Sequence, residues 1–145
     1  MKIQIKKIED KYMNEVIDLL QNISNFKPDN SEYKSIFNSF IEQNDVIGIV
    51  AVVKENKFTD EKVAGFGSVH MTKRIRGGTV GIIEDIAVFE SFRRQGIGRL
   101  IVTNLIENAR NKKCFKLILD CKEDTKLFYE KIGFCHSGCS MTLSL

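Results

Sequence analysis

The segment Arg93-Arg94-Gln95-Gly96-Ile97-Gly98 joins two arginines to two glycines just before a stretch with helical periodicity. The first amides of a helix have no partner inside the helix and carry partial positive charge, and glycine lets an anion approach the backbone closely. The segment therefore predicts a binding site for a phosphate group. It lacks the third glycine of a Rossmann fingerprint and the Gly-Lys-Ser/Thr of a P-loop. A plain glycine-containing turn is the alternative interpretation.

Two adjacent carboxylates, Glu84 and Asp85, interrupt an apolar segment from Thr79 to Val88. If side chains alternated without a break, Glu84 would share a face with apolar neighbours and be buried, which is costly and typical of functional sites. The apolar pair Ile82-Ile83 breaks the alternation and indicates a bulge. The alternative is that one carboxylate points to solvent and the other pairs with a lysine.

Asp120 and Tyr129 are the remaining candidates for chemistry. Asp120 follows the apolar segment 117–119, and ligands of open α/β sheets gather at the carboxyl ends of parallel strands. Tyr129 stands beside Phe128 and Ile132, whose four-residue spacing directs them to the core, so its hydroxyl is free to turn into a cleft. A loop-capping aspartate and a half-buried structural tyrosine are the alternatives.

The elements that must position these residues follow from hydrophobic periodicity. Asp10 is the expected cap of the first helix, and Val46 to Val53 is expected to be a buried central strand. The expected order is a strand at 3–8, helices at 10–23 and 31–41, strands at 46–53, 63–69 and 79–88, a helix at 96–112, a strand at 115–121, a helix at 124–133 and one or two edge strands in 134–145. This βααβββαβαβ order predicts one layered α/β domain over residues 1–145.

Composition narrows the class of protein. The chain has 145 residues, of which 43% are hydrophobic and 28% charged, and its net charge of +3 is too small to indicate nucleic-acid binding. No apolar stretch is long enough to span a membrane and the first residues do not resemble a signal peptide, so we expect a cytoplasmic protein. The four cysteines form no C-x-x-C pair, which argues against structural zinc. We expect buried, reduced thiols, and Cys121 is interpreted as a core thiol rather than a nucleophile.

Together the motifs resemble the GCN5-related N-acetyltransferase (GNAT) superfamily over nearly the whole chain. The resemblance rests on the acidic pair in a strand, the Arg-x-x-Gly-x-Gly turn opening a helix, and the segment Phe128-Tyr129-Glu130-Lys131-Ile132-Gly133-Phe134. Within the superfamily, the segments 83–88, 119–121 and 128–131 are most similar to those of the glucosamine-6-phosphate N-acetyltransferases. The resemblance implies a mixed, centrally splayed sheet and a homodimer. It also implies direct acetyl transfer from acetyl-CoA to an amino sugar phosphate, on the way to UDP-N-acetylglucosamine, without a metal.

The resemblance also implies roles for individual residues. Glu84 and Asp120 would orient or deprotonate the amine, and Tyr129 would protonate the departing thiolate. The acceptor site would consist of Ser24, Arg74, Glu84, Asp85 and Asp120. Acetyl-CoA would contact Ile86, Ala87, Val88, Arg93, Arg94, Gln95, Gly96, Ile97, Gly98, Arg99, Thr125, Phe128 and Tyr129.

Two positions depart from the pattern of the family. Thr125 stands where many of these enzymes have an asparagine, and the segment 141–145 has no arginine to reach a sugar phosphate. An acetyltransferase for a polyamine, an amino acid or a protein N-terminus is therefore an alternative. A non-catalytic acetyl-CoA-binding module is another. A small RNA-binding domain fits less well, because the aromatic residues lie on core stripes rather than on a basic sheet face.

Overall fold

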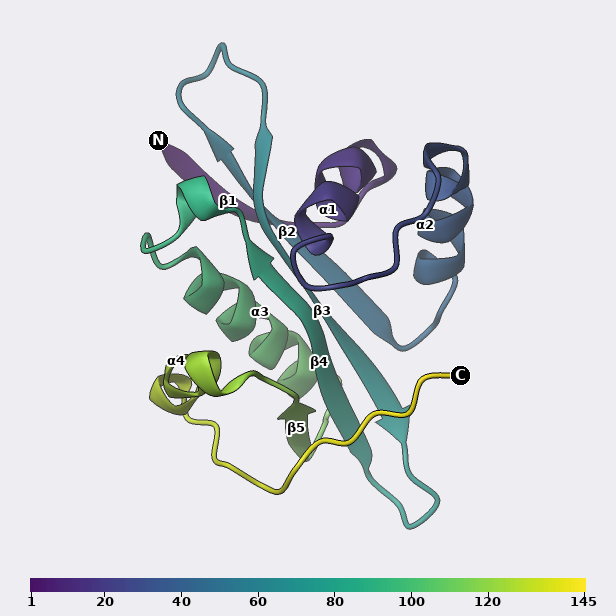
Figure 1. The fold of residues 1–145 in the computed structure, drawn as a ribbon. Coiled ribbons are helices and arrows are strands. Elements are labelled where there is room, and N and C mark those ends of the chain that lie inside the picture. The colour runs from purple at the N-terminus through teal and green to yellow at the C-terminus, as the bar shows by residue number, and fades with distance from the viewer.

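A single five-stranded sheet organises the computed structural model, which describes residues 1–145 (Figure 1). The strands lie in chain order: β1 (Lys2–Lys7), β2 (Val46–Lys54), β3 (Lys62–Lys73), β4 (Thr79–Val88) and β5 (Lys116–Leu119). The first four strands pair antiparallel, whereas β5 runs parallel to β4. The predicted mixed sheet is confirmed.

Helices cover both faces of the sheet. They are α1 (Met13–Leu20), α2 (Tyr33–Ile41), α3 (Ile97–Asn111) and α4 (Lys126–Ile132). In Figure 1, α1 and α2 lie on one side of the long strands, and α3 lies on the other with α4 beside it. None of these helices is both long enough and apolar enough to cross a membrane.

The interior strand β2 contributes apolar side chains to both faces, as its nearly unbroken apolar sequence predicted. Val50 and Val52 face the α1 and α2 side, while Ile49, Ala51 and Val53 face α3. The core on the α3 side contains Ile49, Ala51, Val53, Ala64, Val69, Ile83, Ile97, Ile101, Val102 and Leu105. The core under α1 contains Ile8, Tyr12, Met13, Val16, Leu19, Val50, Val52, Val63 and Phe66.

Two glycines in β3 allow α3 to lie directly on the sheet. A Cβ atom at Gly65 would be 2.7 Å from the Ile101 side chain, and one at Gly67 would be 2.6 Å from it. Such separations are too short for a Cβ atom unless the Ile101 side chain or the helix that carries it shifts. The glycine pair therefore fixes how closely α3 packs against β3.

The first helix begins differently from the expectation, and the second begins with a cap that was not predicted. Asp10 is not a helix cap, because it lies inside a 3₁₀ turn (Asp10–Tyr12) and the residue before that turn makes no side-chain cap bond. A capping box does precede α2: Asp29 accepts a hydrogen bond from the Ser31 amide, and the Glu32 carboxylate accepts one from the Asp29 amide.

The expected edge strands in residues 134–145 are absent, which corrects the prediction. After α4 the chain passes the end of β5 without forming a strand (Figure 1). Residues 135–145 take part in no backbone hydrogen bond, and Met141, Leu143 and Leu145 are exposed. The alternation of these three residues with polar ones is typical of a strand, but alternation alone does not form one unless the backbone also pairs with a neighbouring strand.

The prediction of buried thiols is also wrong. All four cysteines are free, but Cys121, Cys135 and Cys139 are exposed and only Cys114 is partly buried. Cys121 follows an edge strand and the other two lie in the unpaired tail, so no second layer covers them. Burial raises the pKa of the Cys114 thiol.

A charged cluster around Glu61 ties the ends of three elements together. Lys6 in β1 donates a hydrogen bond to Oε1 of Glu61, and the Tyr12 hydroxyl donates to Oε2 at 2.6 Å. These two hydrogen bonds, from Lys6 first and then Tyr12, lower the pKa of Glu61 from 4.5 to about 2. The ionised carboxylate thus links β1 and the start of α1 to the strand that follows Glu61.

We expect the Glu61→Gln variant to lose about 2 kcal/mol of unfolding free energy at pH 7, because the amide forfeits the charge-assisted bond from Lys6. The depressed pKa means that the carboxylate stabilises the fold fully above about pH 4.5 and loses this effect as the pH falls towards 2. Urea unfolding between pH 3 and 7 would therefore show the two proteins converging at low pH. Glu55→Gln, on the same loop, is the control, and a gap that does not depend on pH would contradict the prediction.

Candidate active site

The pairing between β4 and β5 stops halfway along β4. The last paired residues are Ile83 in β4 and Leu119 in β5, although β4 continues to Val88. Beyond this point β4 remains paired with β3 only, so its other edge offers free backbone groups. Glu84 and Asp120 each directly follow the last pair, which places both at the point where the two strands separate.

A bulge follows Glu84, as the broken alternation indicated, although it falls at Asp85 rather than at the apolar pair before it. The register between β3 and β4 shifts between Phe66 and Ser68, and Asp85 has a left-handed backbone with φ of 57°. The buried Ser68 hydroxyl donates a 3.1 Å hydrogen bond to the Glu84 carbonyl, which holds the bulge in place. Glu84 and Asp85 are both exposed, so the burial considered for Glu84 does not occur.

A histidine that the sequence did not single out accompanies the two carboxylates. Nε2 of His70 in β3 lies 3.6 Å from Oε2 of Glu84. Although Asp85 is exposed as a residue, partial desolvation of its carboxyl raises the pKa of that group, and His70 acts in the opposite direction. Residues 68, 70, 82 and 84 share one face of two paired strands, and only this cross-strand register could have identified His70.

The turn between β4 and α3 has the geometry that its glycines suggested. Arg94 and Gly96 have left-handed backbones, with φ of 62° and 78°, and α3 begins at Ile97 without a side-chain cap. The amides of residues 94–99 donate no hydrogen bond within the chain. The guanidinium of Arg93 donates from Nε to the Val88 carbonyl at 3.1 Å. Free amides beside exposed arginines, of which Arg99 on α3 is the third, form an arrangement suited to an anion.

Gly98 brings α4 against this turn. A Cβ atom at this position would lie 3.3 Å from the Phe128 ring and 3.8 Å from Val88. The separated end of β4, the first turn of α3 and the aromatic face of α4 are therefore in contact. Ile86, Ala87 and Val88 all lie on this separated end, which begins at the bulge.

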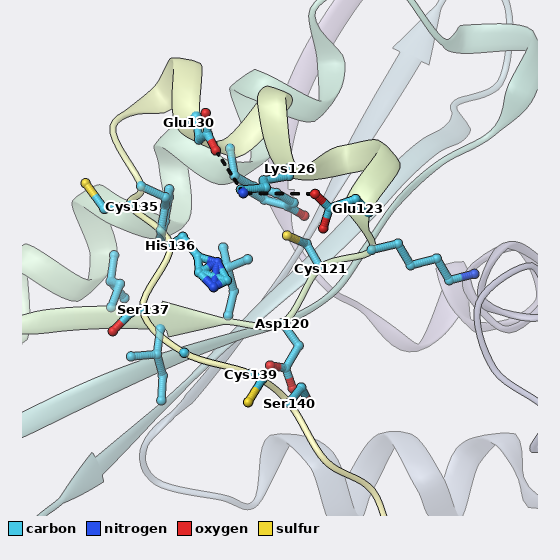
Figure 2. Close-up of a pocket in the computed structure, with 17 residues that line it drawn as sticks. Asp120, Cys121, Glu123, Lys126, Glu130, Cys135, His136, Ser137, Cys139 and Ser140 are labelled. Atoms are coloured by element: carbon cyan, nitrogen blue, oxygen red, sulfur yellow. Dashed lines mark ion pairs between the residues drawn. The ribbon is translucent and has the colours of Figure 1, made fainter.

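Asp120 and Tyr129 line the same cavity of about 350 Å³, bounded by the end of β5, by α4 and by residues 134–140 (Figure 2). Tyr129 is held by edge contacts with Phe128 and Phe134, at ring separations of 4.9 Å and 5.9 Å. Burial raises the pKa of its hydroxyl, and the nearby Cys121 adds to this effect. The hydroxyl therefore stays protonated across the neutral range.

One wall of the cavity carries a chain of ion pairs that runs from the turn before α4 onto α4 (Figure 2). The Lys126 ammonium lies 4.0 Å from Glu123 and 3.8 Å from Glu130. Partly exposed pairs of this kind stabilise a helix only slightly, so we interpret them as support for the short α4.

Of three further expected site residues, two form hydrogen bonds with neighbouring backbone and the third has a side-chain nitrogen without a partner. The Ser24 hydroxyl, in the connection after α1, accepts a hydrogen bond from the Phe26 amide. Thr125 donates its hydroxyl to the Lys122 carbonyl. Arg74 lies at the end of β3, where its Nε is buried without a hydrogen-bond partner. No hydrogen bond or ion pair joins these side chains to Glu84 or Asp120, and no group of three or more side chains suited to a metal ion is present.

The site combines a strand that separates from its neighbour, a helix that begins with free amides, and an adjoining tyrosine. Comparison with known proteins identifies the class of protein that has this combination. The family model described as the acetyltransferase (GNAT) family matches residues 13–134. The chain belongs to this family.

Curated relatives carry a more particular name, glucosamine 6-phosphate N-acetyltransferase. The relative from Trypanosoma brucei brucei is 39% identical over 99 residues, which span 68% of this chain and 67% of that protein. The relative from Arabidopsis thaliana is 34% identical over 96 residues, 65% of this chain and 63% of that protein. The match thus spans just under two thirds of the Arabidopsis protein. A Dictyostelium discoideum relative is 31% identical over 130 residues, covering 88% of this chain and 81% of its own length.

Solved structures share the whole fold. The crystal structure of glucosamine-6-phosphate N-acetyltransferase from Arabidopsis thaliana superposes with a TM-score of 0.88 at 28% identity, over 99% of both chains. A Trypanosoma brucei acetyltransferase superposes with a TM-score of 0.87 at 26% identity, over 99% of this chain and all of that chain.

Proposed function

We propose that this protein transfers the acetyl group of acetyl-CoA to the amine of glucosamine 6-phosphate, in the cytoplasm and as a step towards UDP-N-acetylglucosamine. The observation that carries the proposal is the separation of β4 from β5, which leaves a free strand edge between two acidic residues and the amide-rich turn. The shared name of the curated relatives supports the choice of acceptor.

The coenzyme would lie along the free edge of β4. Its pantetheine arm contains amide groups, which can pair with the backbone of Ile86 to Val88 as an added strand would. Its pyrophosphate would accept hydrogen bonds from the unpaired amides of residues 94–99, with Arg93, Arg94 and Arg99 supplying charge. Thr125 and Phe128, on the opposite side of this path, would contact the arm.

The acceptor would bind beside Glu84 and Asp120, at the point where β4 and β5 separate. Carboxylates there suit an incoming ammonium group and can take up the proton that the amine must lose. Asp85 adds negative charge beside them. Arg74, whose Nε has no partner within the chain, and Ser24 would serve the sugar phosphate.

The reaction would be a direct transfer within a ternary complex. The neutral amine attacks the thioester carbonyl, and a backbone amide near Ile86 stabilises the resulting oxyanion. Collapse of this intermediate breaks the carbon–sulfur bond, and the thiolate takes a proton from Tyr129. The proton lost by the amine passes to Glu84 or Asp120, directly or through water. Alignment of the two substrates would supply much of the acceleration.

The identity of the acceptor can be tested by measuring the release of coenzyme A in the presence of glucosamine 6-phosphate, unphosphorylated glucosamine or spermidine. We expect kcat/KM to be at least about tenfold higher for the phosphorylated sugar, since a charge-assisted contact to phosphate contributes about that much. Arg74→Ala should reduce this preference, whereas Arg76→Ala, in the same hairpin, should not. Equal kcat/KM for the two sugars, or a preference for spermidine, would point to an acetyltransferase for another amine. Tight binding of acetyl-CoA without transfer to any amine would point to a binding module.

The role of Tyr129 is tested by Tyr129→Phe. We expect kcat to fall about a hundredfold, because the phenyl ring keeps the aromatic contacts but has no proton to donate. Tyr33→Phe on α2 is the matched control. Full turnover by Tyr129→Phe, with an unchanged pH profile, would exclude Tyr129 as the proton donor.

The homodimer is part of the same proposal. The outer edge of β5 is unpaired, and residues 135–145 have strand-like alternation but no backbone hydrogen bonds, so each chain can offer the other a strand partner. We expect light scattering at micromolar concentration to give twice the 16.6 kDa mass of one chain. Leu143→Asp should weaken the association, and a monomer at all concentrations would contradict the proposal.

A further inference from the structure

His70 has no role in the function proposed above, yet it lies beside the acceptor site. It stands in β3 opposite Ile82 of β4 and Val46 of β2, two residues along from the Ser68–Glu84 pair. Its ring therefore faces the side of the sheet that α2 covers, on the same face as the Glu84 side chain.

The surroundings of His70 restrict its ring. The edge of the Phe40 ring packs against it at 6.0 Å between centroids, with the planes 89° apart. The side chain of His70 is 29% exposed, whereas that of Glu84 is 53% exposed. The histidine is thus the better fixed of the two side chains, because Phe40 holds it from α2.

His70 approaches both acidic residues of the bulge. Nε2 lies 3.6 Å from Oε2 of Glu84, and the ring also acts electrostatically on the Asp85 carboxyl. The distance of 3.6 Å is an ion-pair separation rather than a hydrogen bond, and such contacts commonly shorten when a substrate binds. A glutamate has three rotatable side-chain bonds, so an exposed one samples several directions unless a partner holds one oxygen.

We propose that His70 is a positioning residue for acetyl transfer: it holds Oε2 of Glu84 and so leaves Oε1 directed at the acceptor amine. This inference rests on the proposed function, because it gives Glu84 its task. His70 contacts Glu84 rather than the reacting atoms, so its effect on turnover passes through that carboxylate.

The test is a double-mutant cycle of His70→Leu and Glu84→Gln, assayed by coenzyme A release. We expect His70→Leu to lower kcat about tenfold in the wild-type background, with the KM for acetyl-CoA unchanged, and to have almost no further effect beside Glu84→Gln. His70→Gln, which can place a donor near the position of Nε2, should recover most of the loss. Thr72→Val, an exposed change on the same strand, is the control for folding.

Equal losses from His70→Leu in both backgrounds would overturn the inference, since a purely structural role against Phe40 would not depend on Glu84. Equal activity of the leucine and glutamine variants would overturn it as well. Proton NMR offers a readout without an acceptor: the His70 ring signals, assigned by their loss in His70→Leu, should shift in Glu84→Gln at constant pH. Unchanged ring signals would overturn the contact itself. A wild-type protein that acetylates no amine would overturn the proposed function and, with it, this role.

Discussion

The separation of β4 from β5 is the constraint on which the site depends. In a continuous sheet both edges of β4 would be occupied, and no extended ligand could pair with the backbone of residues 86–88. The two strands part after Ile83 and Leu119 because β4 bulges at Asp85 while β5 ends. The same event exposes the free strand edge and places Glu84 level with Asp120, so the proposed coenzyme and acceptor sites both depend on one irregularity.

A sheet that is open on one side must be held together by its other contacts. The Ser68 hydroxyl fixes the bulge from β3, and the glycines at 65 and 67 let α3 press against the same strand. The start of α3 is thereby set relative to the end of β4, and Gly98 sets α4 relative to both. Geometry at the site is thus determined by residues on both faces of β3, although β3 supplies none of the expected catalytic groups.

Much of this arrangement is predictable from sequence because it depends on local chemistry. The spacing of Ile97, Ile101 and Leu105 fixes the buried face of α3, and glycines at its start specify the turn. The bulge is visible as a broken alternation, although its position at Asp85 is not, since it depends on pairing with Ser68. Tail residues 134–145 carry a strand pattern but form no strand, and three of the four cysteines that were predicted to be buried are exposed.

Local sequence patterns do not predict contacts between side chains on different strands. Glu61 becomes strongly acidic because β1 and the start of α1 bring Lys6 and Tyr12 to it, and none of the three is adjacent to another in sequence. His70 meets Glu84 through the register of β3 against β4 in the same way. The two clusters differ in one respect that bears on function. Both oxygens of the Glu61 carboxylate accept hydrogen bonds, whereas Glu84 is exposed and has a neighbour only at Oε2, so of the two only Glu84 could serve the proposed transfer to an amine.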